Sequence, residues 1–405
     1  MNKKKVAVVG AGLSGLMAAK ELSKNAFDIT VYEKEVKPGG RMRTDTVHGW
    51  ELDRGFQVLL TGYPYLKKHL EDLSIDLVQL DAGATVFHEN KRSNIGDPGR
   101  DISLLIPTLF SPVGTLKDKW LIFKLQRMLK KKSIAAIFNT ENSTTAAWLK
   151  QYGFSNQIIK RFFQPFYGGI FLEDRLETSC RMFLFVFKMF AEGEAVIPIG
   201  GIGKFSEEIA ALLDGEGVKF YYDTPVQTVG KGKLTTEKRG SEHYDVIINT
   251  ASKLNNNYQI TWKGTYVFYF QHPGEPVIKT PRIGLVADES KVINNVFYAT
   301  ATQSKTREGR QLLSVTVVND DDYSLVELQR KVRQEVTQMV NQKIDYVHHE
   351  VIDYALPDIA SPVDEQKLSI TDQVVHIGDY QLNGSQNAAC KIGEAAAKLL
   401  NEQHA

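Results

Sequence analysis

The sequence predicts an α/β fold in which a nucleotide-binding domain with a parallel sheet is interleaved with a second domain of helices plus an antiparallel sheet. Three observations predict it. A glycine-rich turn follows an apolar strand pattern at the start of the chain, and similar strand and helix patterns return near residues 198–250 and 374–400. The segments between them have other patterns, helical in one and β-rich in the other. The chain is therefore expected to leave the first domain and return to it twice.

The first strand and helix enclose a glycine-rich turn. Residues 6–9 form a β-branched run typical of a strand buried on both faces, and an apolar helical pattern begins at Leu13. Gly10 allows the tight turn, Gly12 lets a pyrophosphate approach the backbone, and Gly15 lets the helix lie close to the strand. The helix N-terminus then offers free N–H groups to phosphates.

A second predicted strand, residues 28–33, ends at Glu33, which lies 18 residues after Gly15. At about this spacing a carboxylate accepts the ribose hydroxyls of a dinucleotide. The alternative is an ordinary strand-helix-strand turn with a solvated glutamate. The residues assigned to the nucleotide here are Gly10, Ala11, Gly12, Leu13, Ser14, Gly15, Glu33 and Lys34.

Composition favours a soluble enzyme. The 405 residues are enough for two or three domains, and 49 basic against 48 acidic residues leave a net charge of +1, which does not indicate a nucleic-acid partner. Cys180 and Cys390 are too few for a disulfide framework, so a reducing, cytoplasmic location is expected. Glycines interrupt the first apolar run, so it does not read as a signal peptide, and no apolar stretch is long enough to span a bilayer.

Residues 34–60 hold a second glycine-rich segment. Gly39 and Gly40 bring backbone close to a neighbour, and Arg41 adds a fixed positive charge suited to a second phosphate. A surface salt bridge is the alternative for Arg41. Gly55 marks a further close approach of the backbone.

The middle of the chain changes character twice. Residues 102–190 are mainly helical in pattern, with aromatic side chains concentrated in 161–171 and 181–190; these either line a site for a large apolar substrate or simply pack a helical core. Residues 259–318 contain β-rich runs that predict an antiparallel sheet, and residues 324–340 predict an amphipathic helix against it.

The last informative stretch, residues 374–400, again has the order strand, turn, helix. Asp379 stands at the end of the strand, and the helix is expected to begin near Ser385, with its positive dipole end and free N–H groups facing the turn. His348 and His349 are adjacent on a predicted strand, so their side chains point to opposite faces; no metal site is predicted.

Together these blocks resemble the flavin-containing amine oxidase superfamily, which includes protoporphyrinogen oxidases, carotenoid desaturases and monoamine and polyamine oxidases. Residues 5–60 resemble its FAD fingerprint, with a GGR signature at residues 39–41 and a flavin-side segment at residues 53–55. Residues 198–230 and 375–400 resemble its later FAD motifs. The likeness is strongest to bacterial proteins grouped with protoporphyrinogen oxidases and phytoene desaturases.

The resemblance implies further FAD contacts. Val226 would hold the adenine edge through its backbone, Asp379 would accept the ribityl hydroxyls, and backbone donors at Asn387 and Ala388 would face the flavin N1/O2 edge. The remaining FAD residues implied are Gly40, Arg41, Met42, Gly55, Phe56 and Gly378. The residues expected to line the substrate site, beside Phe56, are Gln57, Phe163, Phe166 and Tyr167.

The expected domain boundaries follow from these blocks. Residues 1–85, 196–255 and 355–405 form the FAD-binding domain, residues 86–195 form the helical part of the substrate domain, and residues 256–354 form its antiparallel sheet and helix.

The predicted function is FAD-dependent removal of hydride from a hydrophobic substrate of porphyrinogen or polyene/isoprenoid type. The alternatives are an amine oxidase, a flavin-dependent isomerase and a non-catalytic FAD-bound scaffold. Amine oxidases of this superfamily carry a lysine near flavin N5; the alignment places Thr265 there, although a register shift of two would bring Lys263 to that position. The sequence assigns no catalytic acid, base or nucleophile, no electron acceptor and no oligomeric state.

Residues 115–132 have apolar residues at helical spacing and a strong excess of Lys and Arg over a single acid, Asp118. This composition is typical of a helix at a membrane surface, and peripheral contact with the inner face of a membrane is one hypothesis for it. The other, which the sequence favours because basic helices are common on soluble domains, is a solvated basic face on a packed helix.

Overall fold

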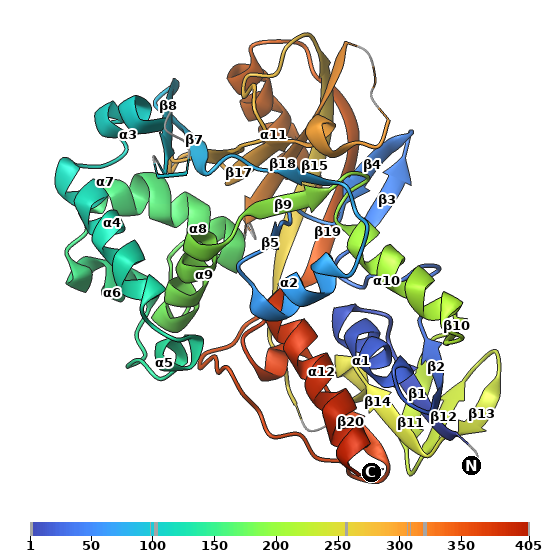
Figure 1. Cartoon of the computed structure of the whole chain (residues 1–405). Coiled ribbons are helices and arrows are strands. Elements are labelled where there is room, and N and C mark those ends of the chain that lie inside the picture. Colours follow the sequence, from blue (N-terminus) through green and yellow to red (C-terminus); the bar gives the residue numbers. More distant parts are fainter. Residues whose placement is uncertain are drawn as a thin grey trace.

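Two sheets organise the computed structural model of the chain, as Figure 1 shows. A five-stranded parallel sheet lies beside the two termini, and a seven-stranded sheet lies at the opposite end of the molecule. The α/β fold expected from the sequence is confirmed. The structure describes residues 3–97, 99–100, 104–255, 258–305, 307, 309–318 and 322–403.

The parallel sheet collects strands from three separate stretches of the chain, in the order β10-β2-β1-β14-β20. β1 and β2 are covered by α1 (Leu13–Ser23), which packs against α12 (Gln386–Glu402). The last four residues of β1, Val-Ala-Val-Val, are buried, as expected for a strand with both faces covered. The strands are β1 (Lys4–Val9), β2 (Phe27–Tyr32), β10 (Lys219–Tyr221), β14 (Val246–Asn249) and β20 (Val374–His376).

The seven-stranded sheet has the order β19-β15-β18-β17-β16-β7-β8, antiparallel except for the β16–β7 pair. α11 (Leu325–Val340) lays its apolar stripe on this sheet. The strands are β7 (Gly83–His88), β8 (Lys91–Gly96), β15 (Trp262–Pro273), β16 (Ile283–Val286), β17 (Asn295–Tyr298), β18 (Arg310–Val318) and β19 (Asp345–Pro357).

Two of the expected domain boundaries fall inside strands of this sheet. The boundary between residues 85 and 86 lies within β7, and that between residues 354 and 355 lies within β19. An apolar strand pattern shows that a segment is extended but does not show which of two sheets it joins.

A helical region extends from residue 105 to residue 192 on one side of the seven-stranded sheet (Figure 1). α9 runs through its centre with most of its side chains buried against the surrounding helices. The helices are α3 (Leu105–Phe110), α4 (Leu116–Lys130), α5 (Ile134–Phe138), α6 (Thr145–Tyr152), α7 (Asn156–Ile158), the π-helical turn η2 (Ile159–Phe163), α8 (Gln164–Phe171) and α9 (Cys180–Glu192). Among the described residues, no helix is both long enough and apolar enough to cross a bilayer.

Smaller elements connect these parts. The helix α2 (Pro64–Glu71) packs against α12, and α10 (Gly203–Gly215) packs against α1. The small strands are β3 (Thr44–Val47), β4 (Trp50–Asp53), β5 (Leu59–Leu60), β6 (Leu77–Gln79), β9 (Ala195–Pro198), β11 (Val226–Gly230), β12 (Lys233–Thr236) and β13 (Gly240–His243).

The N-terminus of α10 is capped by residues far away in the sequence. An Asp53 carboxylate oxygen accepts hydrogen bonds from the Ile202 N–H (2.9 Å) and from the Thr44 hydroxyl (2.6 Å), and that hydroxyl accepts one from the Gly203 N–H (2.8 Å). A Cβ at Gly201 would lie only 2.5 Å from the same Asp53 oxygen. The β3–β4 hairpin therefore fixes the point at which the chain returns to the nucleotide-binding part.

Asp53 makes the stability of this junction depend on pH. Burial raises the pKa of Asp53 to about 6, although the hydrogen bonds from Thr44 and Ile202 act in the opposite direction. An unfolded aspartate has a pKa of about 3.9, so between pH 4 and pH 6 the folded state binds more protons than the unfolded state. This carboxyl therefore lowers the free energy of unfolding as pH rises through that range.

Asp53→Asn cannot ionise, so its free energy of unfolding should not show this fall with pH. From pH 5 to pH 7, the difference in free energy of unfolding between the variant and the wild type should therefore change by about 1 kcal/mol in favour of the variant. Urea unfolding at both pH values measures this difference. Asp223→Asn, at an exposed site, is the control and should show no such change. A wild-type-to-variant difference that stays constant with pH would contradict the assignment.

Candidate active site

The glycine-rich turn has the geometry that a bound pyrophosphate needs. Gly10 has a φ of +100°, and a Cβ there would lie 2.3 Å from the Thr250 hydroxyl oxygen. A Cβ at Gly15 would lie 2.1 Å from the Gly10 carbonyl oxygen, so only glycine allows α1 to approach β1 this closely. Gly12 is different, because nothing lies within 4 Å of its Cβ position and its backbone lines a cavity. The protein leaves space at Gly12 that a ligand can fill.

Glu33 lies at the end of β2, beside this turn. The residue is 5% exposed, and its carboxylate accepts the Ala11 N–H (2.6 Å) with one oxygen and the Glu35 N–H (3.0 Å) with the other. Burial raises the pKa of Glu33, and the two backbone hydrogen bonds oppose that rise. The side chain is thus held at the cavity edge, where a ribose would present its hydroxyls.

The second glycine pair lies directly on the first turn. The Gly39 N–H donates to the Ala11 carbonyl (2.9 Å), and a Cβ at Gly40 would lie 3.2 Å from the Gly12 Cα. Arg41 follows and donates to Asp379 (2.6 Å). The Arg41 guanidinium also lies 5.3 Å from the centre of the Trp262 ring.

The first turn of α12 presents unpaired donors. The Ser385 hydroxyl caps the helix by accepting the Ala388 N–H (3.0 Å), so Ala388 has no free donor. Among the described residues, the N–H groups of Gln386 and Asn387 have no partner. The Gln386 side chain lines the cavity, and its carbonyl oxygen is buried without a hydrogen bond. The free backbone donors therefore lie one residue earlier than expected, because the serine cap uses the third N–H.

Most of these groups border one cavity of about 2110 Å³, roughly twice the top of the usual 300–1,000 Å³ for a ligand site. It has room for a dinucleotide and a second large molecule. The predicted site residues that line it are Gly10, Gly12, Leu13, Ser14, Glu33, Lys34, Gly40, Arg41, Met42, Gly55, Phe56, Gln57, Phe166, Tyr167, Val226, Gly378 and Asp379. Those that do not line it are Ala11, Gly15, Phe163, Asn387 and Ala388.

Each residue outside the lining has a structural position. Ala11 and Gly15 lie buried behind the turn, and the Asn387 side chain accepts the Tyr65 N–H (3.0 Å). Phe163 is fully buried and packs its ring against Phe154. Its neighbour Phe162 lines the cavity instead.

The aromatic segments therefore do both things that the sequence left open: some of their rings line the cavity and others pack the helical core. Phe162 and Phe166 stack at the cavity with ring centres 5.4 Å apart, while Phe183 on α9 packs in the core. Phe187 and Phe190 from the same helix also line the cavity, although neither was singled out from the sequence. Residues three or four positions apart lie on the same face of α9. Counting along the helix at that spacing from one cavity residue would have identified them.

Thr265 and Lys263, both on β15, also line the cavity, on either side of an irregularity in the pairing of β15 with β19. The Thr265 hydroxyl donates to the Val317 carbonyl (3.0 Å). The Lys263 ammonium donates to the Thr178 hydroxyl (3.1 Å) and lies 3.4 Å from an Asp358 carboxylate oxygen.

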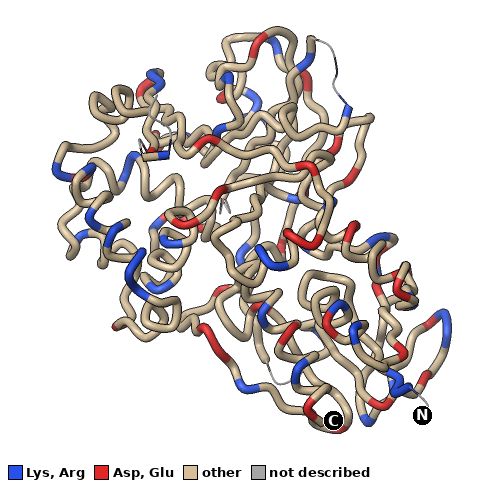
Figure 2. Tube along the Cα trace, in the orientation of Figure 1, with Lys and Arg blue, Asp and Glu red and all other residues tan. Residues whose placement is uncertain are grey.

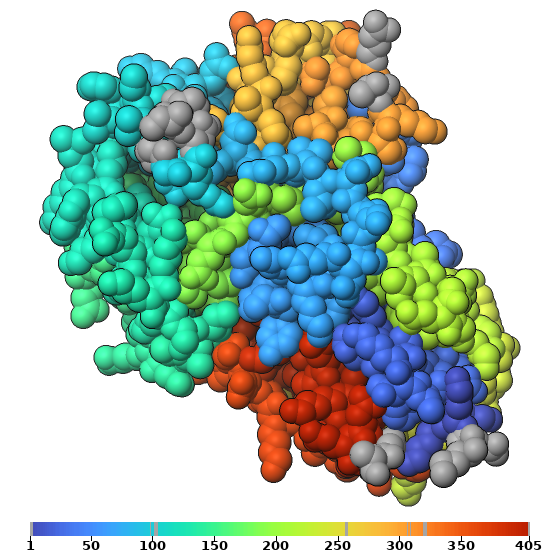
Figure 3. Space-filling view, in the orientation of Figure 1, coloured from blue at the N-terminus to red at the C-terminus, as the bar shows by residue number. Residues whose placement is uncertain are grey.

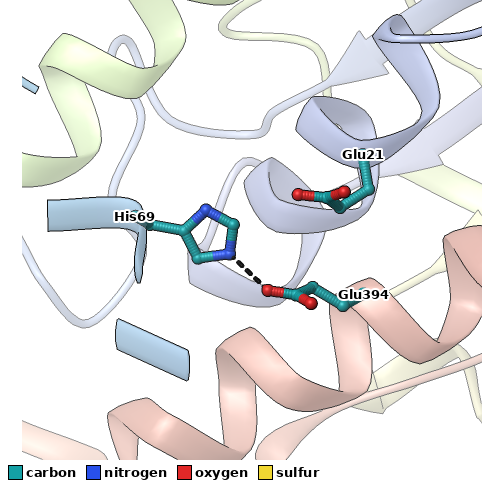
Figure 4. Close-up of side chains that lie close together, drawn as sticks. All are labelled: Glu21, His69 and Glu394. Atoms are coloured by element: carbon teal, nitrogen blue, oxygen red, sulfur yellow. Dashed lines mark hydrogen bonds and ion pairs between the residues drawn. The ribbon is translucent and has the colours of Figure 1, made fainter. Parts of the chain in front are cut away.

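One cluster of possible metal ligands was not anticipated. Glu21, His69 and Glu394 bring one ligand atom each within 4.8 Å of one another, as Figure 4 shows. A charged lysine only donates, so Lys20 (3.2 Å) makes His69 Nδ1 an acceptor; Nε2 then carries the proton and donates to Glu394 (2.7 Å). Lys68 pairs with both glutamates. These bonds occupy both ring nitrogens, and the cluster is a polar junction of α1, α2 and α12.

Comparisons with known proteins agree with this geometry. A model of the family described as flavin-containing amine oxidoreductase matches residues 13–358. Protoporphyrinogen oxidase 2 of Arabidopsis thaliana is 27% identical over 171 residues, 41% of this chain and 32% of that protein. A zeta-carotene-forming phytoene desaturase of Myxococcus xanthus is 25% identical over 260 residues, 56% of this chain and 48% of that protein. An L-amino-acid oxidase of Daboia russelii is 31% identical over 109 residues, 26% of this chain and 22% of that protein.

These matches span less than half of each relative's length. Similar solved structures cover the whole chain. An oxidoreductase from Methanosarcina mazei has a TM-score of 0.74 at 17% identity, covering 98% of this chain and 100% of that one. Putrescine oxidase bound to putrescine has a TM-score of 0.70 at 15% identity, covering 99% of each chain. At such low identities the structural likeness shows the fold alone.

The cofactor of the matched family is a flavin, and the residues present fit FAD. The open space at Gly12 matches a pyrophosphate, and the carboxylates of Glu33 and Asp379 match two sets of hydroxyls. The unpaired N–H group of Gln386, which lines the cavity, matches an anionic ring edge.

Substitutions at two glycines should separate cofactor binding from folding. Gly12→Ala adds a methyl group in open space, so the apoprotein should keep its free energy of unfolding while FAD is lost. Gly15→Ala forces a Cβ against the Gly10 carbonyl and should destabilise the apoprotein by at least about 1–3 kcal/mol. Urea unfolding of the apoproteins and the flavin-to-protein ratio measure the two effects. Stoichiometric flavin in Gly12→Ala would contradict this assignment.

Asp379→Ala should weaken FAD binding by about tenfold to a hundredfold, because a buried charged acceptor typically contributes about 1.5–3 kcal/mol. The loss also leaves Arg41 without its 2.6 Å partner. Asp379→Asn keeps an acceptor and should lie between the alanine variant and the wild type. Titration of apoprotein with FAD gives the dissociation constants, with the exposed-site variant Asp223→Ala as the control. Unchanged affinity in Asp379→Ala would remove this residue from the cofactor site.

Proposed function

The chain belongs to the flavin-containing amine oxidoreductase family and is an FAD-dependent oxidoreductase, and from this premise we propose that it dehydrogenates a large, mainly apolar substrate of porphyrinogen or polyene/isoprenoid type. The observation that carries the proposal is the cavity, which continues beyond the cofactor groups into a chamber bordered by aromatic rings. The aromatic residues of this chamber are Phe56, Phe162, Phe166, Tyr167, Phe171, Phe187 and Phe190.

In such a reaction the protein orients the substrate and excludes water from it. Bound FAD supplies a hydride acceptor. The chamber is lined by residues of the helices α8 and α9 and by residues of the seven-stranded sheet. Phe166 is held by Phe162 on one face and by Tyr167 at its edge, with ring centres 5.4 and 5.2 Å away. A substrate that fills the chamber is oriented by fixed ring faces and displaces water from them.

The surroundings of β15 favour carbon–hydrogen dehydrogenation over amine oxidation. The Thr265 side chain is uncharged and uses its proton on the Val317 carbonyl. Lys263 is held by Thr178 and by the carboxylates of Asp358 and Glu173, the last at 3.7 Å. Neither residue offers a free ammonium group to assist oxygen at the flavin.

The relatives support this choice without deciding it. Two of them are named as a protoporphyrinogen oxidase and a phytoene desaturase, and these align over more of the chain than the L-amino-acid oxidase does. Oxidation of an amine or amino acid is therefore the second candidate.

The test is anaerobic mixing of the holoprotein with polyenes, porphyrinogens, amines and L-amino acids, with flavin absorbance as the readout. We expect bleaching by a polyene or a porphyrinogen only. Turnover of any amine near the usual enzymatic range of about 1–10³ s⁻¹ would overturn the proposal. No bleaching by any class would favour a scaffold, and product formed only with pre-reduced flavin would indicate an isomerase.

A matched pair of variants ties the activity to the chamber. Phe166→Leu should lower kcat/KM for the active substrate by about tenfold, because an oriented ring face is lost. Phe220→Leu, at a partly buried ring that stacks on Tyr222 outside the cavity, should leave it unchanged.

A further inference from the structure

Exposed apolar side chains are concentrated on α3 and α4. Of the sixteen large apolar side chains that are exposed among the described residues, eight belong to these two short helices. Phe110 is 78% exposed and Trp120 is 58% exposed, values unusual for aromatic residues on a solvated surface. The eight residues, which we call the α3–α4 face, are Leu105, Ile106, Leu109, Phe110, Leu116, Trp120, Phe123 and Met128.

The charge around this face has one sign. Residues 116–132 contain seven Lys and Arg side chains and one acid, Asp118. Asp118 is fully buried, and its carboxylate accepts hydrogen bonds from Thr115 and Ser155, so it does not balance the surface charge. Lys124 and Arg127 form no ion pair with any described residue. Figure 2 shows Lys and Arg repeated along this segment at the edge of the helical region.

Apolar and cationic side chains share the outward side of α4. The Lys124 ammonium lies 5.4 Å from the centre of the Trp120 ring, and the Arg127 guanidinium lies 5.6 Å from that of Phe123. Water solvates such cations but not the aromatic rings between them. At a bilayer surface, lipid phosphates can contact the cations while the acyl boundary just beneath them contacts the rings.

The same helices border the mouth of the cavity. Leu105 and Leu109 of α3 and Phe123 of α4 line the cavity and are also exposed at the surface. Figure 3 shows the α3–α4 segment at the outer edge of the molecule, on the side away from the C-terminus. A surface on which this face rests therefore also meets the opening of the cavity.

We propose that the α3–α4 face docks on the surface of an anionic lipid bilayer and turns the cavity mouth toward it. Charge complementarity selects this occupant, because the face presents unpaired cations together with exposed rings. An apolar substrate then passes from lipid to the chamber without crossing water. Docking does not depend on which reaction the flavin performs.

Co-sedimentation of the holoprotein with vesicles tests the docking. We expect binding to vesicles of phosphatidylcholine mixed with phosphatidylglycerol, weaker binding in high salt, and little binding to phosphatidylcholine alone. Each neutralised cation should weaken binding about fivefold, so Lys124→Gln with Arg127→Gln should weaken it by about twenty-five-fold. Arg330→Gln, at an exposed site on α11, is the matched control and should bind as the wild type does. Equal weakening by the control would overturn the proposal.

The depth of insertion gives a second readout. Vesicles of brominated lipid should quench the fluorescence of Trp120, and Trp120→Phe should remove that quenching while preserving binding. Trp120→Ser and Phe110→Ser should weaken binding, whereas Val326→Ser, on α11 and as exposed as Phe110, should not. Absence of quenching would overturn the proposal. So would a lipid-free dimer that Trp120→Ser dissociates, because the face would then belong to a second copy of the chain.

Discussion

The structure depends on the close packing of α1 between its strand and α12. Gly15 brings α1 against the Gly10 carbonyl, and on the other side a Cβ at Gly393 of α12 would lie 2.5 Å from the Ser14 carbonyl oxygen. No side chain can be inserted at either contact without moving backbone. Residues at both helix N-termini, Leu13 and Ser14 of α1 and Gln386 of α12, line the same cavity.

Polar contacts between distant segments then hold the cavity in shape. The Arg41–Asp379 pair joins residues 338 positions apart, and Asp53 caps α10 from a hairpin about 150 residues earlier in the chain. Each uses a buried or half-buried charge, which is costly to desolvate unless the partner is present. Asp379 therefore supports the cofactor site, and Asp53 holds the point at which the chain returns to the nucleotide-binding part.

The sequence by itself determined the nucleotide-binding elements and the identity of the cofactor. Turn, strand and helix within residues 4–33 are local, since glycine spacing and a change of period specify them without help from distant residues. The prediction of FAD rested on the resemblance of several such blocks to the flavin-containing amine oxidase superfamily, and the family match confirms it. The aromatic runs and the basic helix were also recognisable as unusual, because their composition alone departs from that of an ordinary surface.

Only the tertiary structure decided which side of each element faces the cavity. Phe162 lines it and Phe163 does not, and Ala388 loses its donor to the Ser385 hydroxyl, because these outcomes depend on packing partners elsewhere in the chain. The assignment of β7 to the seven-stranded sheet is of the same kind. Pattern specifies what an element is, whereas burial and hydrogen bonding to distant residues decide where it lies and which of its groups remain free.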